Sequence, residues 1–239
     1  MIGVVIPTLD EASYLPGLLA DLQRVHPIVP LDVVVADGGS RDGTRRVAAA
    51  GGARAVVAPR GRARQLNAGA AAAGGEWLLF LHADSRLPPA ARRALLAALV
   101  DEPELAAAVF RFAIDLPPPW KQFIELGQAL RARLYRLPYG DQGLLIRREL
   151  FRAVGGYADI EIMEDVDMIR RIRRRSIAIR TLPAALVTSG RRYGAHGVLR
   201  TWLAHVLLIS LYLLGVPPRR LARLRGGRGG RRGRGGHAA

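Results

Sequence analysis

The stretch LLFLHADSRL (residues 78–87) joins an apolar run directly to an imidazole and a carboxylate. The run at 78–81 lacks alternation, as is typical of a strand that is buried on both faces within a parallel sheet. His82 and Asp84 follow where this strand should end. Because ligands of open parallel sheets bind beyond the carboxyl ends of the strands, the stretch predicts a ligand site at that edge.

The sequence before this stretch predicts the rest of the sheet. Strand-like runs rich in Val and Leu occupy residues 2–7, 31–37, 53–58 and 76–82. The segments between them are long enough for crossover helices and lie near residues 11–25, 43–51 and 61–74. This alternation predicts an α/β fold with a doubly wound, mostly parallel sheet.

The second half of the chain continues the mixed pattern. Two further strands are expected at 106–115 and 142–148, and two helices at 120–137 and 164–175. Residues 198–216 are strongly apolar, but the unbroken run is shorter than the roughly 20 residues that a membrane-spanning helix needs. We therefore expect a packed or interfacial helix there.

The composition limits the chemistry and places the charge. The 239 residues include no cysteine, which excludes disulfides and thiolate metal sites and fits a reducing cytosol. The net charge of +16 comes almost entirely from arginine, which indicates either an anionic partner or a genome biased toward arginine codons. Residues 219–239 hold eight arginines, no acid and little apolar content, and we expect them to be disordered. The expected organisation is a main α/β domain (1–197), an apolar or interfacial helix (198–218) and an Arg/Gly-rich tail (219–239).

Several predicted strands run into polar residues at their carboxyl ends. They are Thr8, Asp10 and Glu11 after the first strand, Asp37 and Asp42 after the second, and His82 and Asp84 after the fourth. Each has a structural alternative, because Asp10 can cap a helix and Asp37 and Asp42 suit Asx turns. Three strand ends that carry carboxylates favour one shared site at the sheet edge.

The usual phosphate-binding loops are missing from the sequence. Neither a G-x-G-x-x-G after the first strand nor a G-x-x-x-x-G-K-[ST] occurs, so arginines or a metal ion would have to bind phosphate. Arg62 and Gln65 begin a predicted helix and can serve this purpose, or they can form a solvated helix face. Glu164 and Asp165 begin another helix, where acids also favour the helix dipole.

Five segments, in this order, resemble a family 2 glycosyltransferase of the GT-A fold. They are VVIPTLDEA (4–12), VVVADGGSRDGT (33–44), RGRARQLNAGAAAA (60–73), LHADSRL (81–87) and MEDVDMIRRIRR (163–174). The chain departs from the family pattern at Asp10, where asparagine is more usual, and at His82, which replaces the first Asp of an Asp-x-Asp motif. YGDQGLLIRRELFRAVGGY (139–157) and RRYGAHGVLR (191–200) are similar to a subgroup of small bacterial enzymes. That subgroup is often placed beside a carotenoid-acid glucosyltransferase or with radical-SAM gene clusters.

The resemblance implies a role for individual residues. Asp165 would be the catalytic base with Glu164 beside it, and Asp84 would bind Mg²⁺ or Mn²⁺, with His196 as a second candidate ligand. The nucleotide sugar would contact Pro7, Thr8, Glu11, Asp37, Gly38, Arg62, Gln65, Asn67, His82 and Ala83. The acceptor would contact Gly140, Asp141 and Gln142.

The implied reaction is inverting, metal-dependent transfer of a sugar, a hexosyl group by expectation, from a nucleotide-diphosphate sugar. The acceptor would be a hydroxyl or carboxyl compound, lipid-like or amphiphilic, if the apolar helix and basic tail hold the enzyme at the inner face of the membrane. The expected location is the cytoplasm. Two alternatives are a nucleotidyltransferase and a protein that binds nucleic acid through its Arg/Gly tail. The tail has no aromatic residues between its arginines, which argues against nucleic acid as a partner.

Overall fold

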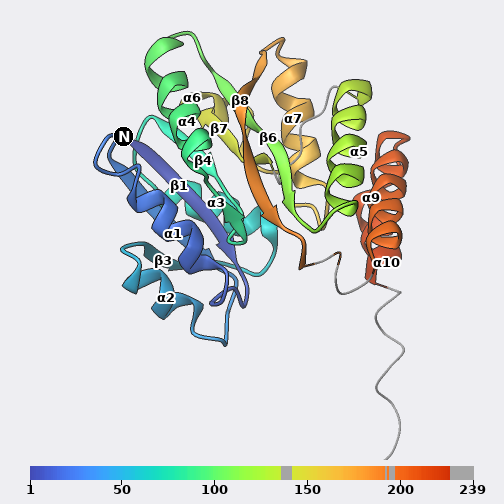
Figure 1. The fold of residues 1–239 in the computed structure, drawn as a ribbon, viewed down its shortest axis with the longest axis horizontal. Coiled ribbons are helices and arrows are strands. Elements are labelled where there is room, and N and C mark those ends of the chain that lie inside the picture. Colours follow the sequence, from blue (N-terminus) through green and yellow to red (C-terminus); the bar gives the residue numbers. More distant parts are fainter. Residues whose placement is uncertain (136–141, 192, 194–196, 227–239) are drawn as a thin grey trace, which may run out of the picture.

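A computed structural model describes residues 1–135, 142–191, 193 and 197–226. Within them, one eight-stranded sheet has the order β3-β2-β1-β4-β7-β6-β8-β5 (Figure 1). Only β7 and β5 run against the other strands, so the sheet is mostly parallel as predicted. The strands are β1 (Ile2–Thr8), β2 (Leu31–Asp37), β3 (Arg54–Val57), β4 (Trp77–Phe80), β5 (Ser85–Arg86), β6 (Ala107–Asp115), β7 (Leu144–Arg147) and β8 (Ile179–Ser189).

Helices cover both faces of the sheet. They are α1 (Leu15–Gln23), α2 (Thr44–Ala50), α3 (Arg62–Ala72), α4 (Pro89–Asp101), α5 (Trp120–Tyr135), α6 (Arg148–Ala153), α7 (Glu164–Arg174), α9 (Val198–Leu213) and α10 (Pro218–Gly226). In Figure 1, α5, α9 and α10 lie together at one end of the molecule, beyond β6. The mixed sheet between helical layers is the doubly wound α/β architecture that the sequence predicts.

The alternating side chains of the central strands build two separate cores. In β1, Ile2, Val4 and Ile6 face a core with α1, α2 and α4, while Val5 faces the opposite core with α3, α6 and α7. In β4, Leu79 faces the first of these cores. Each such side chain is fully buried and stabilises the fold by about 1.5–3 kcal/mol. Burial on both faces explains why these strands lack a polar–apolar alternation.

Strand β8 and helix α4 are absent from the elements that the sequence predicts. β8 contains Pro183, and proline inside an apolar run normally argues against a strand because it cannot donate to the ladder. Here the pairing of β6 with β8 shifts register between Val109 and Arg111, so Pro183 falls in the irregular part. The bulge therefore lets an interior strand contain proline.

The C-terminal helices pack on the domain. Trp202 of α9 lies against Phe123 of α5, with ring centroids 5.1 Å apart, and Leu208 is buried together with Leu221 of α10. The disorder expected for residues 219–239 is thus wrong for their first part, because a fully buried Leu221 fixes α10 to α9. Residues 227–239 lie outside the described part. Among the described helices, none is both long and apolar enough to cross a membrane.

A buried carboxylate connects α1 to β5 and α4. Asp21 accepts hydrogen bonds from Arg86 Nε (2.8 Å) and the Leu87 amide (3.0 Å), and it pairs with Arg24 (3.1 Å) and Arg92 (3.4 Å). Burial raises the pKa of Asp21, but the bonds from Arg86 and Leu87 outweigh burial, and the pKa lies below its usual value. The ionised form of Asp21 therefore stabilises the fold.

We predict that Asp21→Asn lowers the free energy of unfolding by about 2 kcal/mol or more at pH 7, since it removes the charge that three arginines face. A carboxyl with a depressed folded-state pKa stabilises the fold above its ordinary pKa and loses this contribution as the pH falls through the folded value. Urea unfolding of both proteins at pH 7 and pH 3 should thus show a smaller difference at pH 3. The exposed Asp101→Asn is the control, and an equal difference at both pH values would contradict the electrostatic origin.

Candidate functional site

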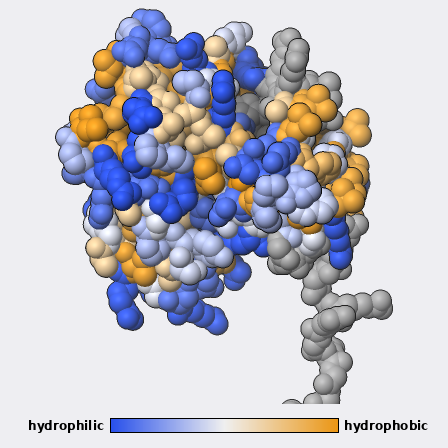
Figure 2. Space-filling model, viewed as in Figure 1, coloured by the Kyte–Doolittle hydropathy of each residue, from blue (hydrophilic) through white to orange (hydrophobic). Residues whose placement is uncertain are grey.

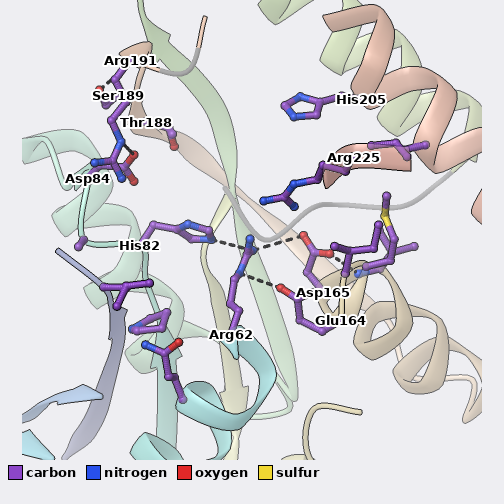
Figure 3. A pocket seen from close by; sticks show the side chains of 18 of the residues that line it. Arg62, His82, Asp84, Glu164, Asp165, Thr188, Ser189, Arg191, His205 and Arg225 are labelled. Carbon is purple, nitrogen blue, oxygen red and sulfur yellow. Dashed lines mark hydrogen bonds and ion pairs between the residues drawn. The ribbon is translucent and has the colours of Figure 1, made fainter. Parts of the chain in front are cut away.

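A cavity of about 460 Å³ lies at the carboxyl ends of β1 and β4, where the sequence predicts a site (Figure 3). Its size suits a small-molecule ligand. Ten of the predicted site residues line it: Pro7, Thr8, Glu11, Arg62, Gln65, His82, Ala83, Asp84, Glu164 and Asp165. Segments that are far apart in the sequence therefore meet at one place.

The two predicted acids begin helix α7. Met163 precedes them with a φ of 69°, in the left-handed region, and this sharp turn starts the helix beside the cavity. Carboxylates in a first turn interact favourably with the positive end of the helix dipole. Glu164 pairs with Arg62 Nε at 2.8 Å, and an Asp165 oxygen lies 3.7 Å from Arg62 Nη2.

Glu164 and Asp165 differ in their access to the cavity. The Glu164 side chain is 5% exposed, whereas that of Asp165 is 21% exposed. Burial raises the pKa of Glu164, the positive charge of Arg62 opposes this rise, and the neighbouring charge of Asp165 adds to it. Asp165 is consequently the acid that a ligand in the cavity can reach, while Glu164 holds Arg62.

His82 also contacts Arg62. Its Nε2 lies 3.0 Å from Arg62 Nη2 (Figure 3). Arginine has only donors, so Nε2 is the acceptor in this contact. Because Nε2 points toward a guanidinium, we favour a contact between His82 and the bound ligand over direct coordination of a metal ion by His82.

Asp84 and Glu11 share one arginine. Arg191 Nε lies 3.0 Å from Asp84, and the two Nη atoms of Arg191 donate to Glu11 at 2.6 and 2.8 Å. The guanidinium also stacks on Tyr14, 4.2 Å from its ring centroid. Burial lowers the pKa of Arg191, but the two carboxylates more than offset it. The short pairing of β5 with β8 brings Arg191 here.

The loops after β1 and β2 are bound to each other. The Asp10 amide donates to Ser40 Oγ at 2.9 Å, and Asp10 Oδ1 accepts from the Arg41 amide at 2.8 Å. Asp10 has a φ of 56°, a conformation in which Asn and Asp are enriched, so aspartate fits where asparagine is more usual. Asp37 accepts two bonds from the Ser40 amide, which is the Asx-turn alternative.

Four predicted site residues within the described part do not line the cavity: Asp37, Gly38, Asn67 and Gln142. Asn67 instead donates to the Tyr157 carbonyl and accepts from the Tyr157 amide, both at 2.8 Å. Gln142 is buried and donates to the Phe110 carbonyl at 3.1 Å. Gly140, Asp141 and His196 lie outside the described residues.

The opposite wall of the cavity was not predicted from the sequence. It is largely apolar and aromatic and comes from β6, α5, α9 and the segment after β8, with one cation from α10: Phe112, Ile114, Gln128, Tyr193, Trp202, His205, Leu208, Ile209 and Arg225. In Figure 3, Arg225 extends toward Asp165, and its charge lowers the pKa of Glu164. The helical period of residues 198–216 indicates an apolar helix face. It does not indicate that this face forms one wall of a cavity.

The side chains of the cavity limit how a metal ion could be coordinated here. Among the residues that the structure describes, no three His, Asp or Glu side chains lie close enough to form a metal site by themselves. Asp84 is the carboxylate at the end of β4 that faces this cavity. Mg²⁺ usually keeps several waters and takes only one or two carboxylates plus substrate phosphates. The residues thus fit an ion that arrives with a phosphate ligand.

The fold and cavity define an α/β protein with a ligand site at the sheet edge. The chain belongs to glycosyl transferase family 2, whose sequence profile matches residues 3–158. It is also 31% identical over 166 residues to the PGL/p-HBAD biosynthesis glycosyltransferase of Mycobacterium bovis, a match that covers 66% of this chain and 63% of the relative. The chain therefore spans less than two thirds of that relative. Family membership favours glycosyl transfer over the nucleotidyltransferase alternative.

Solved structures share the fold. A mannosyltransferase from Pyrobaculum calidifontis, in complex with GDP-Man and Mn²⁺, aligns with a TM-score of 0.64 at 22% identity, over 91% of this chain and 66% of that one. Glucosyl-3-phosphoglycerate synthase from Mycobacterium tuberculosis, in complex with Mn²⁺ and UDP, aligns with a TM-score of 0.60 at 23% identity, over 91% and 81%. These similarities confirm the predicted GT-A architecture.

The contacts of Asn67 predict a structural effect. Asn67→Ala removes two hydrogen bonds to the Tyr157 backbone and should lower the free energy of unfolding by about 1–3 kcal/mol. Chemical denaturation measures this difference. Gln23→Ala, which removes one exposed bond to the Gly51 carbonyl, should change it by no more than about 0.5 kcal/mol. Unchanged stability of Asn67→Ala would favour the ligand-binding role that the resemblance implies.

Proposed function

We propose that this protein transfers a sugar, a hexosyl group by expectation, from a nucleotide-diphosphate sugar to a hydroxyl or carboxyl acceptor, with inversion at the anomeric carbon. One observation carries the proposal: Asp84 and Asp165, from separate parts of a family 2 chain, line the same cavity. The relatives that contain GDP-Man or UDP support a donor of this class.

The donor belongs on the side of the cavity formed by β1, α3 and the segment after β4. Pro7, Thr8 and Glu11 follow β1, and Arg62 begins α3. Helix N-termini and arginine side chains both favour phosphate oxygens. Asp37 and Gly38 do not line the cavity, so their proposed contact with the nucleotide would need the bound ligand to extend beyond it.

A divalent cation, Mg²⁺ or Mn²⁺, fits the proposal through Asp84. When bound with the diphosphate, the ion would supply charge neutralisation to the leaving group. The Mn²⁺ in the two relatives supports this assignment. Asp84 already faces a cation in Arg191 at 3.0 Å, so its carboxylate is oriented toward positive charge. His196 remains a candidate second ligand.

Asp165 is the proposed base. Its carboxylate accepts the proton of an acceptor hydroxyl as the acceptor oxygen bonds to the anomeric carbon and the bond from that carbon to the phosphate oxygen breaks. The nucleoside diphosphate leaves with the electron pair. Arg62 and Arg191 add positive charge on the donor side. An acceptor that is already a carboxylate needs no proton transfer.

The acceptor side supports an amphiphilic compound. Trp202, Leu208 and Ile209 give it an apolar surface, and Arg225 adds a cation near the base. Gly140 and Asp141 remain proposed acceptor contacts, whereas Gln142 donates to the Phe110 carbonyl and does not line the cavity. Together with the basic C-terminal region, this apolar wall supports the proposal that the enzyme is cytoplasmic and works at the inner face of the membrane.

The donor is tested by screening UDP-, GDP- and dTDP-sugars with MnCl₂ or MgCl₂, following nucleotide release and donor binding by calorimetry. Binding of none of these compounds would contradict the proposal. The donor and ion identified in this way are the probes for the two predictions that follow.

Asp84→Asn should weaken metal-supported donor binding at least about tenfold, because an amide cannot replace the charge of a carboxylate ligand. The affinity is measured with the ion and again with EDTA. The control Asp101→Asn should behave as the wild type. A variant at Asp84 that keeps the wild-type metal dependence would show that this residue does not bind the ion.

Asp165→Asn should lower turnover by about 10²-fold or more with nearly unchanged donor affinity, since it removes the proton acceptor. Glu164→Gln keeps the shape of the contact with Arg62 and should have a milder effect. Both variants are compared by kcat and by donor binding. Equal losses, or a loss confined to donor binding, would instead assign this helix start a structural role.

A further inference from the structure

The net charge of the protein is confined to its last third. Residues 168–239 contain 17 arginines, no lysine and no acidic side chain. Residues 1–167 contain 19 basic and 20 acidic side chains and are nearly neutral. A genome-wide preference for arginine would raise the basic content in both parts and would not remove every acid from one. The partition therefore points to an anionic partner of the C-terminal part.

The same part of the chain exposes a ridge of leucines. Leu199, Leu203 and Leu207 are each about half exposed, at 50%, 52% and 52%, and their spacing of four residues places them along one face of α9. We call these three residues the leucine ridge. Leu126 and Leu130 of the adjacent helix α5 are even more exposed. Figure 2 shows hydrophobic residues at the surface of this end of the molecule.

Helix α9 connects the leucine ridge to the cavity. Its other side contributes Trp202, His205 and Leu208 to the cavity wall. An α-helix with its side chains is about 10–12 Å across, so whatever covers the ridge lies about that distance from the acceptor side. Arg200 lines the same surface groove as the three leucines. Arg220 and Arg223 belong to α10, which packs on α9 through Leu221 and Leu208.

We propose that the leucine ridge docks on the interfacial layer of an anionic lipid bilayer and that an amphiphilic acceptor enters the cavity from that side. The bilayer is favoured over a second copy of this chain, because α9 and α10 carry arginines and no acid, so two such faces would bring like charges together. Apolar side chains bury in the acyl boundary while nearby basic residues attract anionic headgroups. The second half of the proposal rests on the proposed function.

Vesicle co-sedimentation of the full chain tests the docking. Wild-type protein should bind DOPC vesicles that contain 30% DOPG at least about tenfold more tightly than pure DOPC, and high salt should weaken this binding. The triple variant Leu199→Ser, Leu203→Ser, Leu207→Ser should lose at least about tenfold in affinity for the anionic vesicles. Arg220→Gln with Arg223→Gln should reduce the preference for DOPG.

The matched control changes three exposed apolar residues elsewhere: Ile28→Ser, Val57→Ser and Val100→Ser. It should bind vesicles as the wild type does. Circular dichroism checks the folding of each variant, and the single change Leu203→Lys replaces the triple variant if the latter is unfolded. Asp165→Asn should bind vesicles normally, which separates a failure of docking from a failure of glycosyl transfer.

Three results would overturn the proposal. The first is failure of the wild type to bind anionic vesicles, and the second is binding of the leucine variants as tight as that of the wild type. The third is a concentration-dependent dimer, seen by light scattering, that the leucine variants abolish, because the ridge would then be an interface between copies of this chain.

Discussion

The ion pair between Arg62 and Glu164 is the contact on which the arrangement of the site depends. Each residue is the first of its helix, α3 and α7, so two positive helix ends meet at one cavity. A guanidinium at such an end is unfavourable without a carboxylate, and the buried Glu164 supplies it. With Arg62 fixed, His82 and Asp165 are held at the same cation from opposite sides.

The two halves of the cavity have different origins. The strands β1 and β4 and the helix α3 form the polar half, and their ends carry charges because the sheet edge is where buried strands meet solvent. The later elements β6, α5, α9 and α10 form the apolar half. A ligand with a charged end and an apolar end matches this division.

Much of the fold could be predicted from the sequence because the strands in its first half are buried on both faces. Continuous runs such as 31–37 signal this burial directly, and their order along the chain sets the parallel topology. β8 could not be predicted, because Pro183 interrupts its strand pattern. Without β8, the position of Arg191 beside Asp84 could not be predicted either. The burial of Leu221 could not be predicted for another reason. A single buried leucine among arginines has no local signature of order.

Acids at strand ends and helix starts reached the cavity only in part. Glu164, Asp165 and Asp84 line it, whereas Asp37 at the end of β2 accepts from the Ser40 amide and does not. The roles of Asn67 and Gln65 were harder to predict, because side-chain amides form hydrogen bonds with the backbone as readily as with ligands. Gln65 lines the cavity, yet its amide donates to the Thr8 and Ala36 carbonyls. Only tertiary structure decides between these uses.

The choice of arginine over lysine has a chemical consequence. Guanidinium groups stay protonated at any physiological pH, and acetylation, which neutralises lysine, does not act on them. The charge that arginine contributes to the C-terminal part is therefore constant. Lys121 is the one lysine of the sequence, and it lies on α5, 4.0 Å from Glu125. Amine-directed reagents thus have a single side-chain target, which lies at the apolar end of the molecule.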